Sequence, residues 1–113
     1  MRNPGIEQDE RRAAISGFIV DVEIRDVTRF DKLWERIHSR FSERNFDFDD
    51  LRHVLLSLGF EERIRGSHHI FARHGIDEIV NIQAVGQLAK PYQVRQVRAI
   101  IVRHGLRGGR DHE

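Results

Sequence analysis

Cysteine is absent from this chain of 113 residues. Its absence excludes a disulfide framework, a thiolate metal site and a cysteine nucleophile. Long apolar runs are also missing, and none approaches the roughly 18 residues that a membrane helix needs. The first residues, Met1–Arg12, are polar and of mixed charge, unlike a signal peptide. We therefore expect a protein of the reducing cytoplasm that does not contact a membrane.

Several common site motifs are lacking as well. There is no GxGxxG loop, no Walker loop and no HExxH helix. Seven histidines are present, but none forms a compact ligand set with carboxylates at a familiar spacing. We therefore expect neither a cofactor nor a bound metal, with a histidine metal site as the less favoured alternative.

The composition indicates one domain with a modest core. Hydrophobic residues make up 39% of the chain and aromatic residues 8%, too much for a disordered chain. The net charge of +1 hides an asymmetry, because residues 63–113 hold nine basic and only four acidic residues. A basic half favours a polyanionic partner such as nucleic acid. The alternative is a solvated helix face and a charged tail.

Residues 1–46 are predicted to form an N-terminal extension. Apolar and charged residues alternate over 17–24, which indicates a possible strand. A helix over 29–42 is predicted from the apolar spacing of Phe30 to Phe41, with Thr28 as its N-cap and Asp31 three residues later. The apolar stripe of this helix predicts that it packs against the rest of the protein. The extension is open to several interpretations: docking of a partner protein, dimerisation, a degraded upstream segment or extra packing.

Residues 47–106 are predicted to form an α+β domain of order α-β-β-β-α, with a three-stranded antiparallel sheet and two helices on one face. A helix begins at the N-cap Asp47 and ends at Gly59, and the last helix begins at Pro91 and ends at Gly105. Strands are expected at 60–65, 68–73 and 79–83, with turns at 66–67 and 74–77, a loop at 86–90 and a frayed tail at 107–113.

The strongest candidates for chemistry are His68 and His69, which follow Gly66 and Ser67 on the second strand. Neighbouring strand residues point to opposite faces, so at least one imidazole should meet solvent or a ligand. Imidazole suits proton transfer near neutral pH, as RNA cleavage requires at the ribose 2′-OH or at the leaving 5′-oxygen. The alternative is that both are ordinary sheet residues.

Cationic and aromatic side chains surround this motif in the predicted fold. Guanidinium and ammonium groups fit phosphates, and a tyrosine ring can stack on a base. Alternatively, the arginines form a solvated rim. The candidate RNA-binding residues are Arg63, Arg65, Gly66, Ser67, His69, Arg73, Lys90 and Tyr92.

Two stretches resemble a known family. The run from Phe48-Asp49-Asp50-Leu51 to Leu58-Gly59-Phe60, followed by Arg65-Gly66-Ser67-His68-His69-Ile70-Phe71, is similar to the HicA (YcfA-like) toxins of toxin–antitoxin pairs. Asn81-Ile82-Gln83 and Lys90-Pro91-Tyr92-Gln93-Val94 resemble a subgroup of that family. The resemblance covers about residues 47–106.

The resemblance implies a small endoribonuclease that cleaves messenger RNA without a cofactor. It also implies a fold like the double-stranded-RNA-binding domain and a HicB-like antitoxin as partner. The family's essential histidine directly follows Gly-Ser. In this sequence that position is His68, so the resemblance implies that His68 is the catalytic acid or base. Many members have a further histidine on or after the third strand, where this chain reads Asn81-Ile82-Gln83-Ala84-Val85-Gly86.

Two other functions stay open at this point. A non-catalytic RNA-binding module on the same fold would use Lys90, Tyr92 and the arginines. A protein-interaction domain, or a toxin that has lost its activity, would bind a protein tightly and RNA weakly.

Overall fold

The structure is a computed structural model, which describes residues 28–108. The possible strand at 17–24 and the end of the tail, residues 109–113, lie outside the described residues. The compact unit that carries the sheet begins at Lys32.

The unit is of the α+β class, as predicted. Three helices, one 3-10 helix and five strands are described. Their bounds are α2 Arg29–Ile37, η1 Arg40–Asn45, α3 Phe48–Ser57, β1 Glu61–Arg65, β2 His68–Arg73, β3 Ile76–Ile82, β4 Ala84–Val85, β5 Leu88–Ala89 and α4 Pro91–His104. The first three strands form an antiparallel sheet in the order β1-β2-β3, and β4 and β5 form a separate hairpin.

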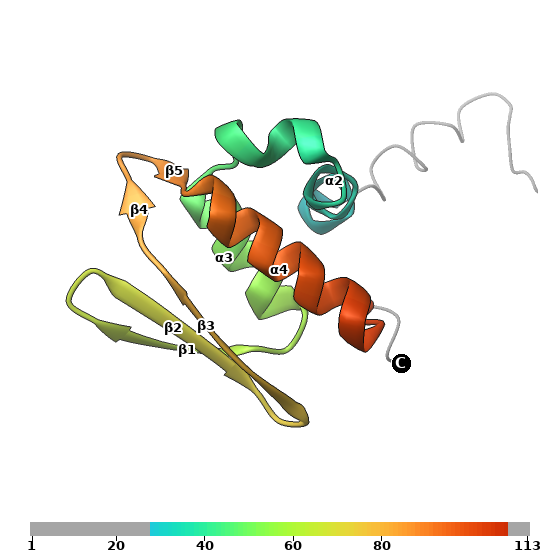
Figure 1. Ribbon diagram of the computed structural model, residues 1–113, viewed down its shortest axis with the longest axis vertical. Coiled ribbons are helices and arrows are strands. Elements are labelled where there is room, and N and C mark those ends of the chain that lie inside the picture. Colours follow the sequence, from blue (N-terminus) through green and yellow to red (C-terminus); the bar gives the residue numbers. More distant parts are fainter. Residues whose placement is uncertain (1–27, 109–113) are drawn as a thin grey trace, which may run out of the picture. The chain divides into compact units, whose positions relative to one another are not determined.

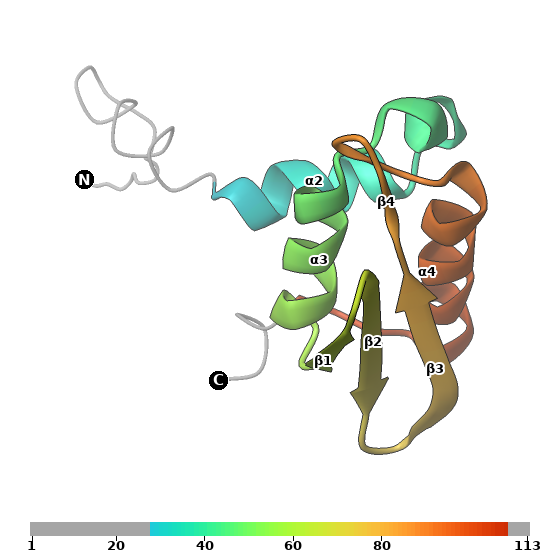
Figure 2. The ribbon, with the colours of Figure 1, turned by 90° about the vertical axis from the view of Figure 1, so that its left-hand side faces the viewer.

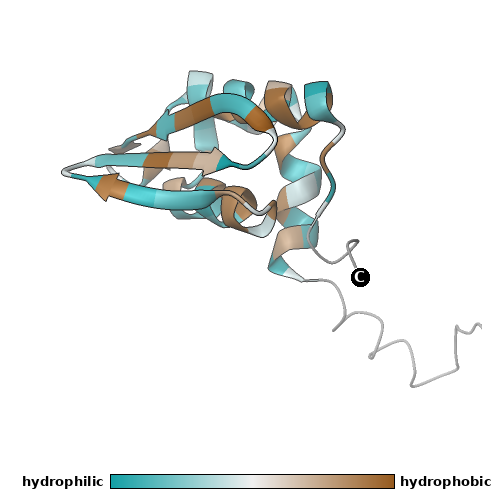
Figure 3. Cartoon of the chain, turned by 90° about the horizontal axis from the view of Figure 1, so that it is seen from below, coloured by the Kyte–Doolittle hydropathy of each residue, from teal (hydrophilic) through white to brown (hydrophobic). Residues whose placement is uncertain are grey.

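Helices α3 and α4 lie on the same side of the sheet (Figures 1 and 2). Apolar residues are interspersed among polar ones along the strands (Figure 3), as expected of a sheet with one covered face. The core between these layers is made of side chains at most 3% exposed: Leu51, Val54 and Leu55 from α3, Phe71, Val80 and Ile82 from the sheet, and Val94, Val97, Ile100 and Ile101 from α4.

The ends of α3 and α4 follow from local sequence, as predicted. The Asp47 carboxylate accepts a hydrogen bond from the backbone N–H of Asp49 at 2.8 Å, which caps α3. Pro91 occupies the first turn of α4. Gly105 ends α4 in the left-handed conformation, with φ of 59°. The buried stripes of both helices therefore face the sheet in the expected register.

The predicted helix over 29–42 is wrong in its second half. Its start is confirmed, since Thr28 and Asp31 exchange side-chain and backbone hydrogen bonds of 3.1 Å. However, α2 ends at Ile37, and Ser39 adopts an extended backbone and caps η1. Phe41 therefore leaves the apolar stripe and is 96% exposed.

The end of the sheet also differs from the prediction. β3 begins at Ile76, three residues earlier than expected, because Gly75 with φ of 89° closes the turn from β2 at once. The predicted loop at 86–90 contains part of the β4–β5 hairpin instead. Backbone bonds from Ala89 to Phe46 and from Phe48 to Gln87 hold this hairpin to the start of α3.

No helix in the described part of the chain is long and apolar enough to cross a membrane.

Candidate functional site

The two faces of β2 differ in their surroundings. Phe71 is fully buried on the helix-covered face, and alternation places His69 on that face as well. His68 and Ile70 therefore point to the opposite face. We call this opposite face, with the residues paired to them in the neighbouring strands, the open face of the sheet. The register adds Arg65 opposite His68, and Arg63 and Asn81 on either side of Ile70.

The imidazole of His68 is exposed and is held by one neighbour. Its Nδ1 lies 3.1 Å from Oδ1 of Asn81 in β3. A carbonyl oxygen can only accept, so Nδ1 carries the proton in this pair. Nε2 is then the nitrogen of the neutral ring that can accept a proton. The pair therefore presents a proton acceptor of fixed tautomer on the open face.

Ser67 lies beside His68 at the turn between β1 and β2. Nε2 of Gln83 donates a hydrogen bond of 2.8 Å to its Oγ, so the hydroxyl hydrogen is left to donate elsewhere. Gly66 has a φ of 58°, a left-handed conformation that a side chain would strain. The turn thus presents a hydroxyl donor next to the imidazole, as an anionic oxygen requires.

Two arginines supply positive charge on the same face. Arg65 pairs directly with His68 across the strands, and Arg63 lies two residues earlier on β1. Both side chains are exposed, and neither forms an ion pair with a carboxylate among residues 28–108. Their guanidinium groups are available to a phosphate that approaches His68.

His69 belongs to a different cluster on the helix-covered face. Its Nδ1 donates to Oε2 of Glu62 at 2.6 Å, and its ring packs edge-on against Phe48 at 4.9 Å between centroids. Arg52 of α3 binds the same carboxylate through two bonds of 2.7 Å. These bonds, chiefly those from Arg52, lower the pKa of Glu62 to about 2. His69 is therefore placed to hold β2 against α3, away from His68.

Three further predicted site residues lie at the other end of β2 or at the start of α4. Arg73 is at the far end of β2, about 17 Å along the strand at the usual rise per residue. Its Nη1 is buried without a hydrogen-bond partner in the described structure, and its Nε lies close to Gly59. Lys90 and Tyr92 are at the start of α4, where Tyr92 is 53% exposed.

Asn81 and Gln83 are the functional candidates that sequence reasoning missed. Each orients a residue of the Ser67–His68 pair, but each is more than a dozen positions away in the chain. The alternation of polar residues in the stretch 81–83 was the available signal, and it needed the strand register to become informative. Among residues 28–108, no three histidine or acidic side chains gather in a group that could hold a metal ion.

No protein-family model, no curated protein and no solved structure matches this chain. The resemblance of residues 47–106 to the HicA toxins therefore stays a prediction from the residues quoted for it. The structure itself places His68, with its Nδ1 on Asn81, and two arginines on one open sheet face, next to the turn that carries Ser67.

Proposed function

We propose that this protein is an endoribonuclease that cleaves RNA at the open face of its sheet, with His68 as the catalytic base. The observation that carries the proposal is the contact between Nδ1 of His68 and Oδ1 of Asn81, which leaves Nε2 of this exposed residue to accept a proton. Arg65 pairs with His68 across the strands and Ser67 precedes His68 in the chain, so we expect both to hold the scissile phosphate.

The reaction transfers the phosphoryl group of the RNA from the 5′-oxygen to the neighbouring 2′-oxygen. Nε2 of His68 takes the proton of a ribose 2′-OH, and the 2′-oxygen attacks the adjacent phosphorus. The bond from phosphorus to the 5′-oxygen breaks, and that oxygen takes a proton from water. The His68 imidazolium then gives its proton to the hydroxide that remains, which restores the neutral imidazole. The products are a 2′,3′-cyclic phosphate and a free 5′-hydroxyl. Arg65 and the Ser67 hydroxyl stabilise the charge that builds on the phosphate oxygens.

We further propose that the cleavage serves a toxin of a toxin–antitoxin pair, with messenger RNA as substrate and a HicB-like protein as inhibitor. The support is the HicA-like sequence over residues 47–106, which includes Gly66, Ser67 and His68. A fold like the double-stranded-RNA-binding domain belongs to the same proposal. It is supported by the order of α3, three antiparallel strands and α4, interrupted here by the β4–β5 hairpin.

One observation favours a second candidate, a non-catalytic RNA-binding module. His68 is the only histidine that β1, β2 and β3 present on the open face. The described residues of this face therefore offer one group for proton transfer near neutral pH, with no second imidazole to protonate the leaving oxygen. A binding module would need the arginines and not the imidazole.

The test is an incubation of the purified full chain with a long messenger RNA in EDTA, followed by gel electrophoresis. We expect fragments from the wild type and none from His68→Ala. His74→Ala is the matched control, because it removes an exposed imidazole from the turn at the other end of β2. It should cleave like the wild type, and all three proteins should give the same circular dichroism spectrum.

Undiminished cleavage by His68→Ala would refute the assignment of the base. An RNA that is shifted on a native gel but cut by no variant would favour the binding module.

A further inference from the structure

A second cationic surface lies away from the open face, where η1 packs beside the start of α4. An open pocket of about 560 Å³ is lined there by Arg40, Phe41, Glu43, Arg44, Pro91 and Arg95. We call it the Phe41 pocket. Its volume is in the range of sites that take small ligands.

Phe41 is the unusual member of this pocket. Its side chain is 96% exposed, although a phenylalanine ring would gain about 2 kcal/mol or more from burial. Side chains three apart in a 3-10 helix lie on one edge, so Arg44 lies directly over the next turn from Phe41. The ring thus stands in solvent, and Arg44 lies on the same edge of η1.

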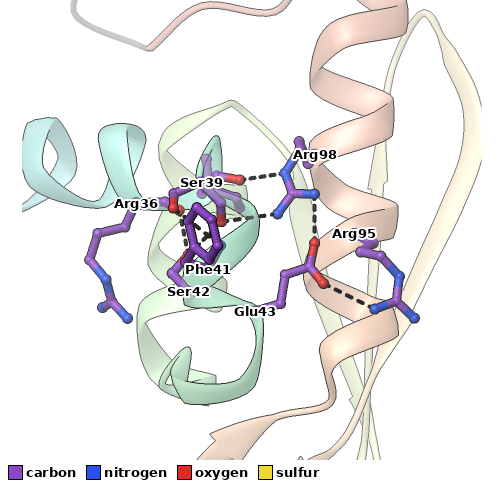
Figure 4. Close-up of polar contacts among 8 residues, drawn as sticks. Arg36, Ser39, Phe41, Ser42, Glu43, Arg95 and Arg98 are labelled. Carbon is purple, nitrogen blue, oxygen red and sulfur yellow. Dashed lines mark hydrogen bonds and ion pairs between the residues drawn. The ribbon is translucent and has the colours of Figure 1, made fainter.

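An ion-pair cluster, which shares Glu43 and Arg95 with the pocket, joins η1 to α4 (Figure 4). Arg98 of α4 donates to Oε2 of Glu43 at 2.7 Å and to the backbone oxygen of Ile37 at 2.8 Å. Arg95 donates to Oε1 of the same carboxylate at 3.0 Å. The donors, Arg98 foremost, hold the pKa of Glu43 below its usual value, so this carboxylate stays ionised. The 3-10 helix η1, which carries Phe41, is therefore tied to α4 by these bonds.

The charge of the pocket is positive beyond this cluster. Arg40 and Arg44 are exposed, and neither forms an ion pair with a carboxylate in the described part of the chain. The one carboxylate of the pocket, Glu43, is shared between Arg95 and Arg98. The pocket therefore favours an anion that also offers a flat apolar surface to the ring.

We propose that the Phe41 pocket binds a nucleotide of single-stranded RNA, with its base stacked on Phe41 and its phosphates at Arg40, Arg44 and Arg95. Aromatic platforms between arginines are how proteins hold unpaired bases regardless of sequence. RNA as the ligand rests on the proposed function. The continuity of the surface supports it, because Tyr92 lies one helical turn before Arg95 on α4 and is itself exposed.

The experiment measures binding of a short, unpaired, fluorescein-labelled RNA to the full chain by fluorescence anisotropy. Every protein carries His68→Ala so that the RNA stays intact. Phe41→Ala should raise the Kd about tenfold, as loss of one stacked base does, while Phe41→Trp should keep it. Each of Arg40→Gln and Arg44→Gln should reduce the slope of log K against log salt by about 0.7.

Lys32→Gln is the matched control, because it removes one exposed charge from α2. We expect the Kd and the salt slope of Lys32→Gln to stay closer to those of the parent protein than to those of the pocket variants. A second readout reports stacking directly: RNA should quench the indole that Phe41→Trp introduces, beyond any quenching of the native Trp34.

An unchanged Kd in Phe41→Ala, or no RNA binding by the parent, would overturn the proposal, and the pocket would then suit an acidic protein segment better. Phe41-dependent binding, together with no cleavage in EDTA by the protein that retains His68, would support the pocket while refuting the role of His68. Cleavage that depends on His68, with binding indifferent to Phe41, would do the reverse.

Discussion

Replacement of Glu62 by glutamine tests how the cluster beneath the sheet stabilises the fold. The Glu62 side chain is 11% exposed and accepts hydrogen bonds from Arg52 and His69. Glu62→Gln keeps the shape but removes the charge. Arg52 then has Asp49 as its remaining ion-pair partner among these residues, and the Asp49 side chain is 61% exposed. The variant should therefore unfold more easily at neutral pH.

The size of the loss follows from the pKa. The pKa of Glu62 falls from its ordinary 4.5 to about 2 in the folded protein. At about 1.4 kcal/mol for each pKa unit, the ionised form contributes at most about 3.5 kcal/mol to the free energy of unfolding. Because the folded pKa is the lower one, this contribution is complete above pH 4.5 and is lost as the pH falls toward 2. Solvent at the edge of the cluster reduces the figure, so we expect about 2 kcal/mol.

Urea unfolding followed by circular dichroism, at several values between pH 7 and pH 2.5, measures this difference. Glutamine does not titrate, so the difference between wild type and Glu62→Gln isolates the protonation of Glu62. Glu61→Gln is the control, since Glu61 is exposed on the other face of the same strand. A loss that is equal at pH 7 and pH 3, or equal in the two variants, would refute the reasoning.

Three further outcomes are expected. Asn81→Leu should slow RNA cleavage, by less than the hundredfold or more that is expected for loss of the His68 imidazole. It should also shift the pH profile of the rate and leave the Kd for RNA unchanged, and a Kd that rises as the rate falls would assign Asn81 to binding. Glu78→Gln should lower the Tm at pH 7 in low salt and much less in 1 M salt, because hydrogen bonds from His104, foremost, and from Arg103 lower the pKa of Glu78 to about 2 at an exposed site. The loss of Tm should fade as the pH falls from 4.5 toward 2, and a loss that does not depend on salt would contradict this reasoning. Phe71→Ala should cost about 3–5 kcal/mol in urea unfolding and Phe41→Ala almost nothing, because the first ring is fully buried and the second is 96% exposed; similar losses would show that Phe41 is packed in solution.

Elements whose ends depend on nearby residues could be predicted from the sequence. Asp47, Pro91 and Gly105 set the ends of α3 and α4 through caps and turns only a few positions long. The turn at Gly66 defined β1 and β2 in the same way. Within this region, apolar spacing also identified the buried faces.

Elements that depend on distant residues could not be predicted. At the end of helix α2, Arg98 donates hydrogen bonds to the carbonyl oxygens of Ile37 and Ser39 from about sixty positions away in the chain. Periodicity alone continued the helix to Phe41. The same reason applies to the site: His68 was identified from its neighbours in sequence, but Asn81 required the register of β2 on β3.

The pairing of Phe46–Phe48 with Gln87–Ala89 has a consequence for the folding kinetics. Two backbone bonds join segments roughly 40 residues apart, and the whole three-stranded sheet lies in the loop between them. Closing a flexible loop of that length costs about 3 kcal/mol of chain entropy before any contact inside it repays the cost. Contacts of such long range slow folding, so the helices and the β1–β2 hairpin should form early and this closure should limit the rate.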